Sequence, residues 1–229
     1  VSYDNYLDVI KLRLSSGDAP DIMFGGPGTY PELVNAGYIM DLSDKDYISR
    51  VSEGSLSLQK MDDKVYAVPL DQMANVVFYN KDIFNDLGLT VPTTYTEFID
   101  TCKALKDAGY AACAAGYQDA ISIGANFYTM FYGTPYLSCE NYVDETQNQG
   151  KSWGEYPTFA QALTQFREII GYQNEDCRTI TTDRAEQLFA NGESGMIIIG
   201  TWGLGAIMNY NPDLNCGGFM YPSEEKAED

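Results

Sequence analysis

The stretch that decides the fold is KVYAVPLDQMANVVFYNK, from Lys64 to Lys81. Val65 to Val68 predicts a short buried strand, and Pro69 then removes a hydrogen-bond donor and bends the chain. The apolar and aromatic run from Ala74 to Tyr79 predicts a second strand. Two strands joined by a polar break are typical of a chain that leaves one folded unit for another. An ordinary pair of strands joined by a loop is an equally open alternative.

The polar break between the two strands reads Leu70-Asp71-Gln72-Met73. If the chain crosses between two units here, Asp71 and Gln72 lie at the floor of a cleft, where ligands tend to bind. On both sides of the break, helical patterns alternate with short strands. This alternation predicts an α/β protein with a mixed sheet in each unit.

The composition excludes several classes of function. The chain has 229 residues, of which 45% are hydrophobic, enough for a real core. Its net charge of −19, from 33 acidic and 14 basic residues, argues against a nucleic-acid partner and an anionic membrane surface. Histidine is absent, which removes Ser-His-Asp and Cys-His catalysis and the usual zinc sites. We therefore expect no cofactor, no metal site and no catalytic residue of these histidine-dependent kinds.

The five cysteines are widely spaced, and no two of them form a C-x-x-C motif. We expect most of them to be small buried hydrophobic residues. In an exported protein, a bridge between Cys139 and Cys177 is a further alternative, which the spacing leaves open.

Two loops follow predicted strands at positions where α/β proteins bind ligands. In the first, Asp21 to Phe24 predicts a strand, and a glycine-rich loop leads to Thr29, a candidate helix cap before Pro31. The spacing of these glycines does not match a phosphate-binding loop. Tyr30 in this loop is a candidate ligand contact, or alternatively packs beneath its own helix.

The second half of the chain gives similar signals. Thr94 to Glu97 and Thr158 to Gln161 both predict capping boxes, and the second helix places Leu163, Phe166, Ile169 and Ile170 inward. A small-residue strand at 111–116 is followed by a loop that carries Asp119. An apolar strand at 195–199 is followed by Gly200-Thr201-Trp202-Gly203.

These motifs, in this order and spacing, resemble the extracellular solute-binding proteins of carbohydrate ABC importers, the maltose-binding protein-like group. The resemblance covers residues 6–222 and rests on Ser16-Gly17-Asp18-Ala19-Pro20-Asp21, Gly37-Tyr38-Ile39-Met40-Asp41-Leu42, Asp63-Lys64-Val65-Tyr66-Ala67-Val68-Pro69, Tyr79-Asn80-Lys81-Asp82-Ile83-Phe84, Gly88-Leu89, Val91-Pro92-Thr93-Thr94 with Glu97, Phe189-Ala190-Asn191-Gly192 and Gly200-Thr201-Trp202. One departure from the family pattern is the absence of tryptophan at positions 94 and 95.

The resemblance implies a two-lobed periplasmic-binding-protein-like (type II) fold that is incomplete at both ends, as in an internal fragment. The expected division is a partial first α/β lobe in 1–70, a hinge crossing in 71–76, a second lobe in 77–216, and a second hinge strand with a truncated return to the first lobe in 217–229. It also implies an extracellular, lipid-anchored or periplasmic monomer. That protein would capture a sugar or oligosaccharide by hinge closure and deliver it to the permease subunits of an ABC importer.

The resemblance also selects site residues. The family's aromatic residue at the position of Trp202 stacks on sugar, and the main-chain amides from Gly200 and Thr201 onward are candidate donors to its hydroxyls. From its surroundings alone, Trp202 would more often be a core anchor. Asp119 is a candidate acceptor for two neighbouring hydroxyls, or alternatively caps the helix that follows it.

Two further functions remain open. A glycoside-processing enzyme needs only two carboxylates and no histidine, although the surroundings of the acidic residues single out no pair. A ligand-sensing input module of the same fold would differ in regions outside this sequence.

Overall fold

The structure, a computed structural model, describes residues 3–71, 73–133, 145–146 and 148–224. The chain divides into two compact units, Val1–Gln72 and Met73–Asp229, and each is described by itself. The division falls within the 71–76 segment, and hinge movement there stays a prediction. Within the described ranges, every helix is too short or too polar to span a bilayer.

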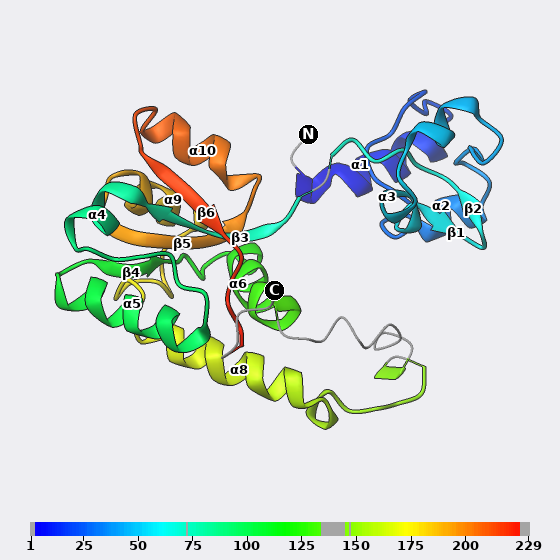
Figure 1. Ribbon diagram of the computed structural model, residues 1–229. Helices are drawn as coiled ribbons and strands as arrows, with labels where there is room; N and C mark the ends of the chain where they lie inside the picture. The colour runs from blue at the N-terminus through cyan, green and yellow to red at the C-terminus, as the bar shows by residue number, and fades with distance from the viewer. Residues whose placement is uncertain (1–2, 72, 134–144, 147, 225–229) are drawn as a thin grey trace. The chain divides into compact units, whose positions relative to one another are not determined.

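The first unit consists of short helices and one small hairpin (Figure 1). In chain order its elements are α1 (Tyr3–Ser15), α2 (Pro31–Asn35), η1 (Asp46–Arg50), α3 (Glu53–Ser57), β1 (Lys60–Met61) and β2 (Lys64–Val65). β1 and β2 pair antiparallel, and the two residues between them, Asp62 and Asp63, have φ values of 51° and 63°. This left-handed backbone matches the tight turns that join hairpin strands.

The mixed sheet expected in the first unit is wrong for its described residues, which form only the antiparallel β1–β2 hairpin, because two expected strands are shortened or absent. The expected strand from Val65 to Val68 is reduced to its first residue, which ends β2. Residues 21–24 form no strand. The Phe24 N–H donates to the Tyr6 hydroxyl, and the Tyr30 hydroxyl donates to the Phe24 carbonyl, each at 2.9 Å. Side chains therefore satisfy this backbone, where a neighbouring strand would otherwise be needed.

The second unit is built on a four-stranded sheet with the order β4-β5-β3-β6. Its strands are β3 (Asn75–Asn80), β4 (Ala111–Ala114), β5 (Ser194–Gly200) and β6 (Cys216–Phe219). β3 pairs antiparallel with both β5 and β6, whereas β4 runs parallel to β5. All seven residues of β5 are buried, because the strand has a neighbour on each edge and helices on both faces.

Helices cover both faces of this sheet (Figure 1). The described helices of this unit are α4 (Lys81–Asp86), α5 (Tyr95–Asp107), α6 (Ala120–Gly133), α8 (Pro157–Ile170), α9 (Thr182–Ala190) and α10 (Gly203–Tyr210), and the short η3 (Trp153–Glu155) precedes α8. Met196 and Ile198 of β5 pack with residues of α5, α6 and α8. Ile197 and Ile199 point the other way and pack with α9 and α10. The alternation follows from the two-residue period of a strand.

Residues 217–224 belong to this second unit as described. β6 lies at the edge of the sheet, and further on the Tyr95 N–H donates to the Glu224 carbonyl at 2.9 Å. The return of 217–229 toward the first unit, and its role as a hinge strand, therefore stay predictions.

The helix starts confirm one expected cap and correct two others. The Thr94 and Glu97 capping box is present with both of its hydrogen bonds. The expected box at Thr158 is wrong: α8 begins at Pro157, whose fixed φ suits the first helical position, so Thr158 lies inside the first turn. α2 likewise begins at a proline, and its cap position is Tyr30, one residue after Thr29.

The inward face of α8 also differs from the expectation. Leu163 was expected inward but is 46% exposed, whereas Ile169 is fully buried as expected. Gln165 is buried in its place, because its amide donates to the Ser223 carbonyl at 2.9 Å and accepts from the Tyr221 hydroxyl at 3.2 Å. The periodicity of apolar residues could not predict this burial, because it depends on hydrogen bonds from Gln165 to residues far away in the sequence.

Candidate functional site

Two loops that carry predicted site residues emerge at one edge of the second unit's sheet. β4 and β5 are parallel, so the loop after Ala114 and the turn after Gly200 leave the same edge. β3 is antiparallel to β5, and its first residue, Asn75, lies opposite Gly200. The strand pairing and the chain order thus place Asp119 and Trp202 on loops at this edge, where open α/β sheets bind ligands.

Trp202 is at the start of α10 and is 41% exposed. It is therefore not a core residue of this unit. Its ring lies against Gly200: a Cβ atom placed on that glycine would be 1.6 Å from Cζ3 of the indole. Only a glycine leaves room for the ring in this position, so the backbone of β5 supports one side of a half-exposed aromatic surface.

Hydrogen bonds fix the turn that carries this tryptophan. The Thr201 N–H donates to the Ala74 carbonyl at 2.8 Å, and the Ala74 N–H donates to the Thr201 hydroxyl at 3.4 Å. These bonds extend the pairing of β3 and β5 beyond Gly200. The Thr201 hydroxyl thus has a structural partner, and it remains able to donate its own proton.

Asp119 caps α9, whereas the sequence suggested that it caps the helix that directly follows it. Its Oδ2 accepts from the Thr182 N–H at 2.7 Å, at the start of α9. The following helix, α6, receives only the main-chain carbonyl of Asp119, which accepts from the Ser122 N–H at 3.2 Å. Within the part of the chain that is described, the other carboxylate oxygen of Asp119 makes no hydrogen bond, and the residue is partly buried.

Tyr30 is a core residue of the first unit. It is 4% exposed and packs with Ile10 and Leu33, and its hydroxyl donates to the Phe24 carbonyl. In the structure Tyr30 therefore packs against its own helix, which was the alternative to a ligand contact. A ligand contact by Tyr30 stays a prediction that its burial does not favour.

Asp71 is exposed at the end of the first unit, in the segment that precedes β3. Gln72 lies outside the described residues, as does Cys139 and therefore its suggested bridge to Cys177. Among the described cysteines, Cys102, Cys113 and Cys177 are buried and free, as expected for small hydrophobic residues, and Cys216 is free and partly buried.

Two polar residues at this edge were missed by the sequence reasoning. The Oδ1 atom of Asn75 is buried and has no hydrogen-bond partner among the described residues. Glu186 of α9 is 6% exposed, and burial, followed by the nearby Asp183 carboxylate, raises its pKa to about 7. A sequence signal existed for both, because Asn75 opens an apolar strand and Glu186 lies on the apolar face of its helix with Phe189.

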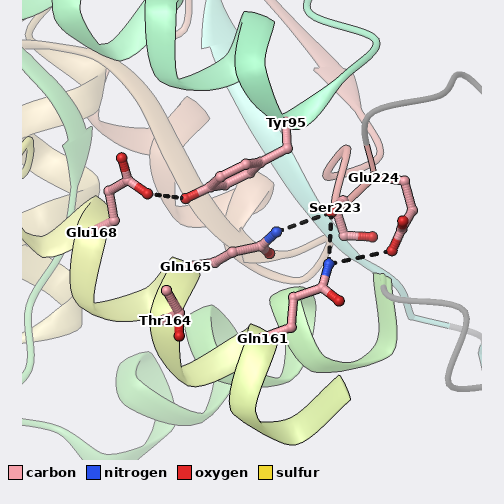
Figure 2. A pocket seen from close by; sticks show the side chains of 7 residues that line it. All are labelled: Tyr95, Gln161, Thr164, Gln165, Glu168, Ser223 and Glu224. Atoms are coloured by element: carbon pink, nitrogen blue, oxygen red, sulfur yellow. Dashed lines mark hydrogen bonds between the residues drawn. The ribbon is translucent and has the colours of Figure 1, made fainter. Parts of the chain in front are cut away.

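A separate polar pocket of about 290 Å³ lies elsewhere in the second unit. Figure 2 shows its side chains, which come from α5, α8 and residues 223–224. The Tyr95 hydroxyl donates to Glu168 at 2.6 Å, and the Gln161 and Gln165 amides both donate to the Ser223 carbonyl. Its polar groups thus largely satisfy one another and hold the chain after β6 against α8. None of the predicted site residues lines this pocket.

No group of three or more acidic or cysteine side chains suited to a metal ion occurs among the described residues. The edge that carries Trp202 instead combines an aromatic surface with single polar side chains, whereas the Thr201 amide, expected as a donor to ligand, is already bonded to the Ala74 carbonyl. Such a set suits a neutral, hydroxyl-rich ligand, since the ring can cover C–H groups while the polar atoms bond hydroxyls.

A family model described as bacterial extracellular solute-binding protein matches residues 1–216. The chain belongs to this family. Its α/β fold is the type II fold of such proteins, as the sequence predicted.

Individual relatives agree with the family. The Multiple sugar-binding protein of Streptococcus mutans is 28% identical over 224 residues, which cover 95% of this chain and 53% of the relative. The Melibiose/raffinose/stachyose-binding protein MelE of Bacillus subtilis is 23% identical over 236 residues, covering 99% and 54%. The chain thus spans about half the length of these curated relatives.

Solved structures give the same picture. The apo form of RafE from Streptococcus pneumoniae matches with a TM-score of 0.79 at 27% identity, covering 99% of this chain and 59% of that one. RafE in complex with raffinose matches with a TM-score of 0.79 at 28% identity, covering 99% and 60%.

Proposed function

We propose that the protein containing this chain is the extracellular substrate-binding component of an ABC importer. It captures a sugar or oligosaccharide and delivers it to the membrane permease, without chemical conversion of the sugar. It acts as a monomer, either lipid-anchored at the cell surface or periplasmic. The family assignment and the sugar-binding names of the relatives support this function.

Within this chain, the main support for the proposal is the position of the Trp202 ring. A half-exposed indole that lies on Gly200 offers its outer part to the C–H face of a sugar ring. Stacking on an aromatic ring removes apolar surface from water without requiring a charged ligand. The position at the carboxyl end of β5 agrees with the usual place of ligands in open α/β sheets.

The other candidate residues serve the hydroxyl groups of the sugar. The remaining oxygen of Asp119 accepts from one hydroxyl, and Asn75 and Thr201 supply further polar atoms at the same edge of the sheet. Asp71 and Gln72 precede β3 and are proposed to contribute from the crossing. Closure about residues 71–76 is the proposed movement that traps the ligand.

A thermal-shift screen of the full-length protein tests this function. Raffinose, stachyose, melibiose and single hexoses are added at increasing concentration, and a bound sugar raises the melting temperature by mass action. We expect stabilisation by at least one oligosaccharide and no release of reducing sugar during long incubation. Release of reducing sugar would favour the glycosidase alternative instead.

A further inference from the structure

Glu186 is a buried carboxylic acid without a partner. It lies on α9 and is 6% exposed, and no hydrogen bond or ion pair reaches it from any described residue. An ionised carboxylate in such a place loses much of its hydration, and no described side chain compensates for that loss.

The Glu186 carboxyl lies close to the turn that carries Trp202. A Cβ atom on Gly203 would lie 3.1 Å from Oε1 of Glu186 and 2.7 Å from Cδ1 of Ile199. Gly203 is buried and is the first residue of α10, directly after the tryptophan. The first N–H groups of an α-helix have no partner within the helix and favour negative charge. The carboxyl of α9 therefore lies beside the helix start that presents the aromatic ring.

One turn earlier on α9, the same face is connected to the other loop of the site. The hydroxyl of Thr182 is buried without a hydrogen-bond partner among the described residues. Its N–H donates to Asp119. The face of α9 that carries Thr182 and Glu186 thus contacts both the Asp119 loop and the Trp202 turn.

The charged groups around this carboxyl oppose its ionisation. Asp183 lies on the same helix and, after burial, is the second cause of the raised pKa of about 7. Tyr210, at the end of α10, is hydrogen-bonded to Asp183 through its hydroxyl. From β5, the apolar side chain of Ile199 lies at the same glycine as the carboxyl. The guanidinium of Arg184 points elsewhere, to Gln187.

We propose that Glu186 is a positioning residue for Trp202: as a neutral acid it packs beside Gly203 and leaves the Gly200–Gly203 turn in place, and its ionisation loosens the turn and weakens sugar binding. The neutral acid is tolerated next to Ile199 and Gly203. The ionised form recruits water or the amides at the start of α10. Either change displaces Trp202, which directly precedes that helix. The effect on affinity rests on the proposed sugar-binding function, whereas the effect on the Trp202 turn does not.

The test uses the full-length protein labelled with fluorotryptophan. The fluorine resonance of Trp202 is assigned by its loss in the Trp202→Phe variant, and it is followed without ligand from about pH 5.5 to about pH 8.5. We expect it to titrate near neutral pH in the wild type and to become pH-independent in Glu186→Gln. Asp183→Asn removes the neighbouring charge, so the midpoint should move to lower pH. Glu175→Gln, at an exposed position, is the matched control and should titrate like the wild type.

Affinity is measured in parallel with raffinose as the probe. We expect wild-type affinity to fall about threefold or more between the two ends of the pH range, since half a pKa unit of coupling corresponds to that factor. Glu186→Gln should remove this dependence.

Three outcomes would overturn the inference, namely a Trp202 signal that does not titrate, a titration that persists in Glu186→Gln, and a midpoint unchanged by Asp183→Asn. If raffinose fails to bind at every pH while the signal still follows Glu186, the sugar-binding function is refuted for this probe and the positioning role is supported.

Discussion

Replacing Trp202 distinguishes an effect on sugar affinity from an effect on folding. Because its ring is half exposed and rests on a glycine, Trp202→Ala should leave the fold of the second unit intact. We expect sugar affinity of the full-length protein to drop about a hundredfold, as for the loss of one well-placed aromatic contact. Calorimetry measures the affinity, and circular dichroism checks the fold.

Trp153 is the matched control for this change. It packs against Phe159 and Tyr156 in an aromatic cluster around η3 and α8, and its replacement by phenylalanine keeps that packing. Trp153→Phe should bind sugar like the wild type. If Trp202→Ala instead unfolds the protein, and binding is lost only in proportion to the unfolded fraction, the ring is a core anchor.

Gly200 determines where that ring can lie. In Gly200→Ala the new methyl group would overlap the indole, so the ring has to leave its present position. We expect weakened sugar binding together with altered tryptophan fluorescence. Gly205→Ala in α10 meets nothing within 4 Å and should leave affinity unchanged, with a gain in helix stability of about 0.5–1 kcal/mol. Unchanged binding in Gly200→Ala would contradict the proposed platform.

At the level of single elements, Asp119 has a structural role that can be separated from a role in binding. Its carboxylate caps α9, so Asp119→Ala should lower the free energy of unfolding by about 1 kcal/mol in urea titrations. Thr94→Ala removes the cap of α5 and should cost a similar amount. Only the Asp119 variant should also lose sugar affinity. If both variants bind sugar with equal affinity, Asp119 caps α9 but does not bind the sugar.

At the scale of the whole molecule, Glu186 should make stability depend on pH. Its pKa is raised from an ordinary value of 4.5 to about 7 in the folded state. Between these values the folded protein holds a proton that the unfolded chain has lost, so the contribution of Glu186 to the free energy of unfolding falls as pH rises and is lowest above about pH 7. Glu186→Gln should therefore be more stable than the wild type above neutral pH, and this advantage should vanish near pH 4.5. An equal difference at all pH values in urea titrations would argue against the raised pKa.

Hinge closure is also a property of the whole molecule. If residues 71–76 act as a hinge, raffinose or another bound sugar should reduce the radius of gyration of the full-length protein in solution scattering. The Trp202→Ala variant at the same sugar concentration should keep the ligand-free radius. Tight binding with no change in radius would exclude closure as the trapping movement.

The sequence by itself determined the α/β class, the strands at the centre of the second unit and the Thr94 capping box. Each of these follows from local chemistry: an unbroken apolar run requires burial on both faces, and a Thr-x-x-Glu pattern pairs with its own backbone. The order of motifs also indicated the family. Trp202 and Asp119 could be singled out because each follows a recognisable strand and because the family resemblance implies a ligand there.

Only the tertiary structure decided what each of these side chains contacts. The cap on Thr182 by Asp119 joins residues that are 63 apart in sequence, and the burial of Glu186 depends on the packing of α9 against the start of α10. Tyr30 is buried for the same kind of reason, since its hydroxyl finds the Phe24 carbonyl once the chain has folded back. Periodicity reports which face of an element is apolar, but hydrogen bonds between distant segments decide which polar groups remain available to a ligand.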